Sequence, residues 1–247
     1  MTPWTICRLR RCVAPGALLL AIACAMSAGP GRLARALGHD WRHIGLDGLC
    51  VTEGKVKKTA SNRLSVDVPK MRAYVTQWTA QSIAIRFAYL GGTDQKSRLG
   101  SGETRLQFGL KLRAQDPCNL VYVMWRIEPQ SKIVVSIKRN PDEHASAACG
   151  NHGYENIKPT KALSVPDLKP GDSHTLRADM KNQELHVYID DREVWQGILG
   201  GDAAALAGPV GIRSDNVHLE FDLKTEDYHG IHPDYAIACK KETANSD

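Results

Sequence analysis

Hydrophobic and polar residues alternate through much of the chain after residue 80, with the period of two that a β-strand with one buried face produces. In the clearest run Leu106, Phe108, Leu110 and Leu112 alternate with Arg105, Gln107, Gly109, Lys111 and Arg113. Similar runs predict strands at 83–89, 121–127, 132–138, 174–180, 184–190, 192–199 and 217–223. The only helical signal is one turn at 203–206. With shorter pieces included, roughly ten or more strands are expected, which favours a sandwich or barrel.

The segment 139–172 departs from this pattern, because it holds four prolines and no alternation. A loop of this length inside a compact domain is usually functional or disordered. It contains Cys149, so we expect a disulfide to hold it in place.

The N-terminal 36 residues have the pattern of a secretory signal. Arg8, Arg10 and Arg11 precede a short apolar run at 17–23, which is below the roughly 20 residues needed to span a membrane. The predicted organisation is a signal at 1–36, a domain at 37–225 and a polar tail at 226–247. The mature chain, without a transmembrane segment, is then exported to the periplasm or the extracellular space. Two alternatives remain: a lipoprotein anchored at Cys24 and a twin-arginine signal at Arg10–Arg11.

Charge argues against a nucleic-acid partner. The whole chain has a formal charge of +5. Loss of residues 1–36 removes five of the 32 basic residues and no acid, so basic and acidic residues balance at 27 each. A nucleic-acid-binding domain is typically basic, and the mature domain is neutral.

Four cysteines remain after the signal: Cys50, Cys118, Cys149 and Cys239. In an exported chain they suggest two disulfides with three alternative pairings. We favour Cys50–Cys239, which joins the ends of the domain, and Cys118–Cys149, which ties the long loop to a hairpin.

Three consecutive blocks carry a family resemblance. They are Ser173–Asp179, Leu185–Trp195 with its "L-x-V-Y-I-D-D" hairpin, and Gly208–Asn216, read as a turn into the final strand. Together they resemble the concanavalin A-like lectin/glucanase jelly rolls, which include laminin-G-like domains. The resemblance implies an all-β fold, an antiparallel β-sandwich (jelly roll), with its first and last strands side by side. That neighbourhood supports the Cys50–Cys239 pairing. The fold hosts lectins, glycosidases, lyases and adhesion modules, so it leaves the activity open.

The polar faces of three successive strands form the strongest candidate binding site. Strands joined by tight turns usually pair, and the family builds its concave glycan-binding sheet from these mid-chain strands. Arg113 and Ser136 share this face, and the long loop, which contains Asn151, is expected to form the wall at one end of the site. The alternative to a binding site is the ordinary solvated face of an antiparallel sheet. The predicted ligand-binding residues are Gln107, Lys111, Tyr122, Arg126, Lys138, Arg139, His144 and Tyr154. Their basic and aromatic side chains would stack sugar rings and neutralise acidic groups.

Catalytic motifs give no clear signal, so no catalytic residue is assigned. Glu220, Asp222 and Glu226 come near the glucanase motif, but the last is one residue too late, and a solvated outer face is favoured. The known alginate-lyase motifs are absent.

Metal and aromatic signals are equally weak. No cofactor or metal is predicted; the alternatives are calcium at Asp190–Asp191 or Asp215–Asn216 and a metal at His229 and His232. Trp195 is expected to be packed rather than to serve as a stacking platform.

The resulting prediction is an exported, non-catalytic, glycan-binding or cell-envelope-associated protein whose partner is a polysaccharide, acidic if the basic residues contact it. Whether it is an enzyme stays open, with a hydrolase or lyase of unrecognised active site as the alternative. An adhesion module that binds protein is the third class.

Overall fold

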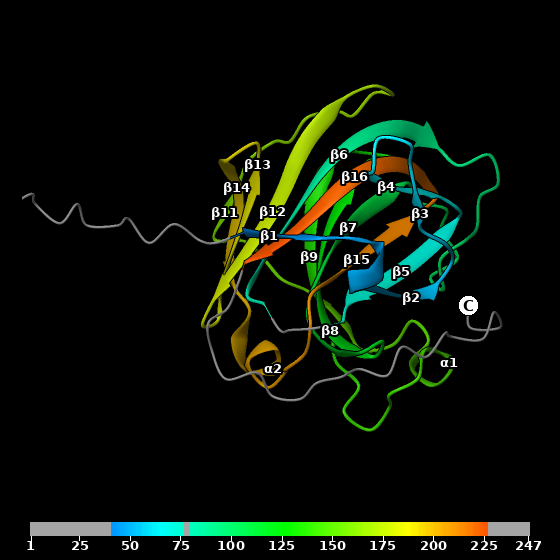
Figure 1. The fold of residues 1–247 in the computed structure, drawn as a ribbon. Helices are drawn as coiled ribbons and strands as arrows, with labels where there is room; N and C mark the ends of the chain where they lie inside the picture. The colour runs from blue at the N-terminus through cyan, green and yellow to red at the C-terminus, as the bar shows by residue number, and fades with distance from the viewer. Residues whose placement is uncertain (1–40, 77–79, 227–247) are drawn as a thin grey trace, which may run out of the picture. The chain divides into compact units, whose positions relative to one another are not determined.

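The computed structural model describes residues 41–76 and 80–226 of the 247-residue chain (Figure 1). The predicted signal, the two tail histidines and Cys239 lie outside the described residues. Within the described part the chain forms two antiparallel sheets, which we call the back sheet and the groove sheet. No helix in the described part is both long and apolar enough to cross a membrane.

The back sheet has nine strands. In spatial order it contains β11 (Lys161–Ala162), β14 (Arg192–Ile198), β13 (Glu184–Ile189), β12 (Ser173–Lys181), β6 (Ser82–Gly92), β16 (Val217–Glu226), β4 (Leu64–Asp67) and β3 (Lys57–Lys58), with β1 (Trp41–Ile44) also paired to β16. The pairing of β1 with β16 places the first and last described strands side by side, as the family resemblance implied.

The groove sheet has seven strands. In spatial order it contains β10 (Tyr154–Asn156), β9 (Lys132–Lys138), β8 (Asn119–Arg126), β7 (Gln107–Asp116), β15 (Gly211–Asp215), β5 (Lys70–Val75) and β2 (Leu49–Glu53). Three short helices complete the described elements: η1 (Leu46–Gly48), α1 (Ser146–Cys149) and α2 (Gly200–Ala204).

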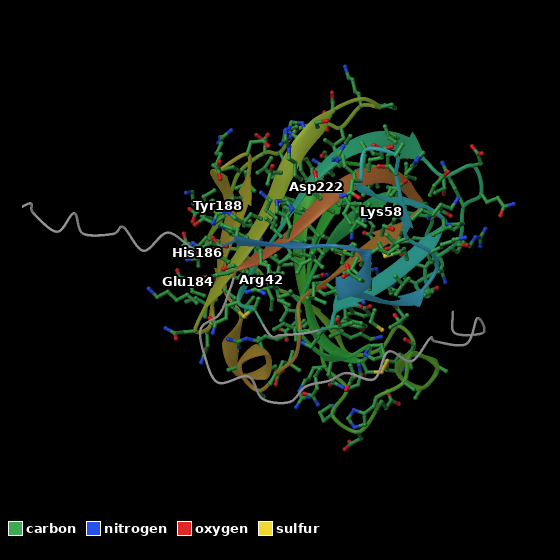
Figure 2. The ribbon with its side chains drawn as sticks, in the orientation of Figure 1. Arg42, Lys58, Glu184, His186, Tyr188 and Asp222 are labelled. Atoms are coloured by element: carbon green, nitrogen blue, oxygen red, sulfur yellow. A yellow bond between two sulfur atoms is a disulfide. The ribbon has the colours of Figure 1, made fainter. Side chains whose placement is uncertain are left out.

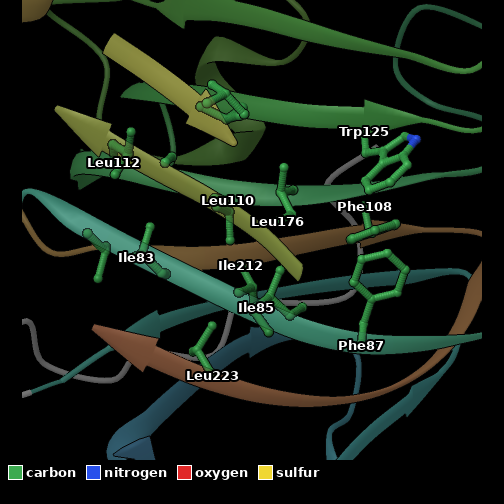
Figure 3. Packing of buried hydrophobic residues seen from close by; sticks show 14 of the residues in the cluster. Ile83, Ile85, Phe87, Phe108, Leu110, Leu112, Trp125, Leu176, Ile212 and Leu223 are labelled. Atoms are coloured by element: carbon green, nitrogen blue, oxygen red, sulfur yellow. The ribbon is translucent and has the colours of Figure 1, made fainter. Parts of the chain in front are cut away.

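The core lies between the two sheets and follows the predicted alternation. The alternating apolar residues that pack in this core include Ile83, Ile85 and Phe87 of β6, Phe108, Leu110 and Leu112 of β7, Val121, Val123 and Trp125 of β8, and Leu185, Val187 and Ile189 of β13. Figure 3 shows Phe87, Phe108 and Trp125 gathered at one end of this core, with ring centroids 4.5 Å apart for Phe87–Phe108 and 5.6 Å for Phe87–Trp125. Both pairs are edge-on, a favourable geometry for aromatic rings. Trp195 is also buried, as expected.

One stretch was interpreted wrongly from the sequence. Residues 211–215, read as part of a turn, form β15 in the centre of the groove sheet, between β7 and β5. A single residue, Asn216, then connects β15 to β16 in the centre of the back sheet. Its backbone is left-handed, with φ 59°, and its side-chain amide bonds to Ser97 and to the carbonyl of Arg105. These bonds explain the Asn at this position without a metal.

The long loop is held as predicted by the Cys118–Cys149 disulfide, which closes a sequence separation of 31 residues. The loop also contributes β10 to the edge of the groove sheet, which its lack of alternation did not predict. The pairing Cys50–Cys239 stays a prediction, because Cys239 lies outside the described residues.

Candidate functional site

A groove of about 380 Å³ runs across the outer face of the groove sheet. Its floor is formed by the side chains of β5, β7, β8, β9 and β15 that point away from the core. Loop residues 99–101, α1 and β10 form its walls. The opposite face of the molecule belongs to the back sheet: all six side chains labelled in Figure 2 (Arg42, Lys58, Glu184, His186, Tyr188 and Asp222) come from its strands.

Most of the predicted binding residues meet in this groove. Six of the eight line it: Gln107, Lys111, Tyr122, Arg126, Lys138 and Tyr154. Ser136 and Asn151 line it as well, so the long loop walls one end as expected. The predicted face is much less solvated than an ordinary outer face, since Lys111 is 1% exposed and Lys138 is 4% exposed.

Arg139, His144 and Arg113 lie elsewhere. Arg139 is past the end of β9, where it donates a hydrogen bond to Asn119 Oδ1 at 2.9 Å, and His144 Nδ1 lies 2.7 Å from Asp116 Oδ2. Both side chains therefore brace the disulfide loop. The backbone of Arg113 is left-handed (φ 47°) at an irregularity in the β7–β8 pairing, which breaks the alternation. Its guanidinium bonds to the carbonyls of Asn182 and Ala203.

A buried carboxylate that the sequence interpretation missed organises the floor of the groove. Asp215 is 0% exposed and accepts hydrogen bonds from Arg72 at 2.7 Å, Gln107 at 2.7 Å and Arg213 at 2.9 Å. Burial acts to raise the pKa of Asp215, but Arg213 and Arg72 outweigh it and hold this pKa well below the usual range of a carboxyl. Asp215 thus holds two groove arginines in place. Asp215 was one of the candidate calcium ligands, and its carboxylate oxygens accept hydrogen bonds from Arg72, Gln107 and Arg213.

Two tyrosines and a cation form the end of the groove beside β10. Tyr122 and Tyr154 stack with ring centroids 6.0 Å apart, and Arg213 lies 5.0 Å from the centroid of Tyr122. Arg213 also donates a hydrogen bond to the Tyr154 hydroxyl at 3.3 Å, and Lys138 Nζ is 5.1 Å from the Tyr154 centroid. Tyr154 is 39% exposed as a residue, so this cluster includes an accessible aromatic side chain.

The same cations change the acidity of the two phenols in opposite directions. Burial and the neighbouring Tyr154 raise the pKa of Tyr122. Burial also acts to raise the pKa of Tyr154, but the positive charges of Arg213 and Lys138 prevail and lower it. Tyr154 is therefore the more acidic phenol of the groove.

Positive charge dominates the lining. Among the described residues that line the groove, seven are cationic: Lys70, Arg72, Arg105, Lys111, Arg126, Lys138 and Arg213. The one lining carboxylate is Glu53, which pairs with Arg72 at 3.7 Å. Even with Asp215 beneath the floor, the groove carries a net positive charge and is suited to an anion.

The carboxylates considered for catalysis lie on the other sheet. Glu220 and Asp222 are on the outer face of β16, where Arg63 pairs with Asp222 at 3.2 Å and with Glu220 at 3.9 Å. This arrangement agrees with the favoured interpretation of a solvated outer face.

The described part of the chain contains no group of three or more His, Cys, Asp or Glu placed to hold a metal ion. His229 and His232 lie outside the described residues. Asp190, the other calcium candidate, is bonded to His174 Nδ1 at 2.5 Å and to the Thr175 amide at 2.8 Å.

Comparison with known proteins identifies the fold and no closer family. Neither a family model nor a curated protein matches the sequence. Among solved structures, the carbohydrate-binding module CBM66 from Bacillus subtilis is similar over 70% of this chain and 91% of its own, with TM-score 0.50 and 12% identity. The carbohydrate recognition domain of Emp46p is similar over 74% of this chain and 89% of its own, with TM-score 0.46 and 14% identity. The Crh5 transglycosylase is similar over 76% of this chain and 83% of its own, with TM-score 0.46 and 12% identity. The chain therefore has the concanavalin A-like jelly-roll fold.

Proposed function

We propose that the protein is an exported, non-catalytic glycan-binding protein that holds an acidic saccharide in the groove. The observation that carries the proposal is the composition of the groove lining, where seven cations and the stacked pair Tyr122–Tyr154 face a single carboxylate. Aromatic faces suit sugar rings, and Lys and Arg suit carboxylate or sulfate groups. The Cys118–Cys149 disulfide agrees with an oxidising compartment.

The similar structures agree with this proposal at the level of fold. Proteins of this fold include one titled a carbohydrate-binding module and one titled a carbohydrate recognition domain. Identities of 12–14% carry no ligand from those proteins to this chain, so the choice of an acidic saccharide depends on the groove itself.

Neutralising Lys138 tests the proposal. In a glycan array with neutral, uronic-acid and sulfated saccharides, we expect the mature protein to bind the acidic classes. Lys138→Gln keeps a hydrogen-bond donor near the Gly150 carbonyl, which Lys138 contacts at 2.6 Å, but removes the charge. Loss of a partly desolvated charge contact predicts at least about a tenfold weaker affinity.

The matched control for this test is Lys58→Gln. Lys58 is exposed on β3 of the back sheet and does not line the groove, so its replacement should leave binding unchanged (Figure 2). Equal weakening by both variants would indicate non-specific charge attraction, and no binding to any saccharide would reject the proposal.

One observation favours a second candidate, a polysaccharide lyase. The pKa of Tyr154 is lowered beside two cations, which is the environment of a phenolate general base. In β-elimination the base takes the proton from the carbon next to a uronate carboxylate. A carbon–carbon double bond then forms, the bond to the glycosidic oxygen breaks, and the phenol returns the proton to that oxygen. The cations would stabilise the carboxylate as negative charge builds up on it.

An assay for unsaturated uronates separates the two functions. For a non-catalytic protein we expect none from polyuronate substrates, with either the wild-type protein or Tyr154→Phe. Steady release by the wild-type protein that falls at least about a hundredfold in Tyr154→Phe, with saccharide affinity retained, would establish the lyase instead.

A further inference from the structure

We infer that the groove recognises a saccharide chain with anionic groups on separate sugar units, and that Arg126 binds one of these groups at the end of the groove opposite Lys138. The inference deepens the proposed function and rests on it, because it concerns the same groove. It adds which cation contacts the ligand directly and how far apart the charges of the ligand must be.

Arg126 differs from the other groove arginines in having no hydrogen-bond or ion-pair partner among residues 41–76 and 80–226. Arg72 and Arg213 are bound to Asp215, and Arg105 is paired with Glu103. No residue in the described part of the chain forms a hydrogen bond or ion pair with the Arg126 side chain, and its Nε is buried without an acceptor. A buried donor without an acceptor costs stability unless a ligand supplies the acceptor.

The positive charge of Arg126 is also not balanced by a negative charge of its own nearby. Burial and the positive charge of Arg105 disfavour its charged form and lower the pKa of Arg126, while Glu103 acts in the opposite direction. Glu103 is already shared with Arg105. An anionic group on the ligand would supply the missing negative charge and accept from the planar guanidinium fork, as carboxylates and sulfates do.

The second cationic position lies far along the same strands. In the β8–β9 pairing, Arg126 is opposite Lys132 and Leu120 is opposite Lys138. At about 3.3 Å per residue, these two ends of the pairing are about 20 Å apart along the strands. One anionic sugar therefore cannot reach both Arg126 and Lys138.

The floor between these two positions suits uncharged parts of a sugar chain. Tyr122 and Met124 of β8 and Val134 of β9 line it, and Gly109 of β7 lies between Met124 and Arg213 in the sheet. A Cβ atom at Gly109 would come within 2.1 Å of the Val123 carbonyl oxygen. The glycine thus keeps this part of the floor flat. Along β8 and β9 the order is therefore Arg126, an apolar floor, and then Lys138 with the aromatic rings.

Chain length and Arg126 substitution test the inference together. Isothermal titration calorimetry with oligogalacturonides from one to six units, and with heparin oligosaccharides of matched lengths, measures affinity against length for carboxylate and sulfate ligands. We expect the wild-type affinity to rise at least tenfold once a chain spans both cationic positions. Arg126→Gln should remove that increase with chain length. Arg126→Lys should restore part of it, because the charge returns without the fork.

The controls separate this inference from the proposed function. Arg126 has no hydrogen-bond or ion-pair partner among the described residues, so its variants should unfold at or above the wild-type temperature. Lys58→Gln should match the wild type in every titration. If Lys138→Gln weakens all acidic ligands while Arg126→Gln binds six-unit chains like the wild type, the inference is wrong and the proposed function stands. A monosaccharide that binds as tightly as a six-unit chain would also overturn the inference. Absence of binding by the wild-type protein to both series would reject the two together.

Discussion

Asp215→Ala should lower the free energy of unfolding by about 3–5 kcal/mol, because it removes the buried carboxylate that Arg72 and Arg213, each only 12% exposed, share. The carboxylate is fully buried, and three donors converge on it. Urea unfolding at neutral pH, followed by tryptophan fluorescence, measures the loss. Saccharide binding should fall as well, since the same substitution frees two groove arginines from their fixed positions.

The pH dependence of stability gives a second readout of the same contact. The pKa of Asp215 is depressed in the folded protein, whereas it is about 3.9 in an unfolded chain. The ion pair therefore contributes its full stability above about pH 4 and loses it as the pH falls toward the folded-state pKa. The stability difference between the wild type and Asp215→Asn should shrink steadily below about pH 4.

Asp222→Asn is the matched control. Asp222 also pairs with an arginine, Arg63, at 3.2 Å, but its side chain is 33% exposed on the back sheet (Figure 2). An exposed pair is worth about 0–1 kcal/mol, so the control should unfold nearly like the wild type. Equal losses in the two variants would show that burial of Asp215 has no special role.

Trp125→Ala should be comparably damaging, with an expected loss of about 3–5 kcal/mol. Trp125 is fully buried against Phe87 and Phe108, and its indole nitrogen donates a hydrogen bond to Ser131 Oγ at 3.0 Å. The substitution opens a cavity where the two sheets meet and removes this bond (Figure 3). Chemical denaturation followed by circular dichroism measures the loss.

Ile198→Ala provides the comparison for this second substitution. Ile198 is 61% exposed on β14, so its truncation should change stability by less than about 0.5 kcal/mol. The loss of stability in Trp125→Phe should lie between those of Trp125→Ala and Ile198→Ala. A Trp125→Ala protein as stable as the wild type would mean that this aromatic cluster does not hold the sheets together.

Period-two alternation predicted the long strands well, because those strands have one face in the core. β9 was predicted at 132–138 with the bounds that it has, and the hairpin β12–β13 was predicted to within a residue or two. β5 was overlooked, although Met71, Ala73 and Val75 alternate with Lys70, Arg72 and Tyr74. That overlooked pattern would have placed Arg72 and Tyr74 on the groove face.

Other parts of the site carry no local signal. β15 has a single large apolar residue, Ile212, among Gly, Ser and Asp, so a turn was the natural interpretation and Arg213 and Asp215 were missed. Their importance depends on neighbours more than 100 residues away, such as Gln107. The burial of Lys111 was equally hidden, because its ammonium group packs on the ring of Tyr74, 37 residues earlier in the chain, at 3.9 Å from the ring centroid. Arg113 does not lie on the predicted face, because its own backbone is left-handed, and hydrophobic periodicity gives no sign of such a residue.

The one-residue link at Asn216 has a consequence for how the protein is made. The strands on either side of it, β15 and β16, lie in the interior of the groove sheet and the back sheet, and they are the last two described strands. Neither sheet is complete until β15 and β16 have been synthesised. Strands β5 and β7 of the groove sheet and β1, β4 and β6 of the back sheet therefore emerge with one partner still missing. Folding by such distant pairings is slow. The nascent chain should therefore stay open and accessible to chaperones through most of its synthesis, and both halves of the sandwich should form in one late, cooperative step.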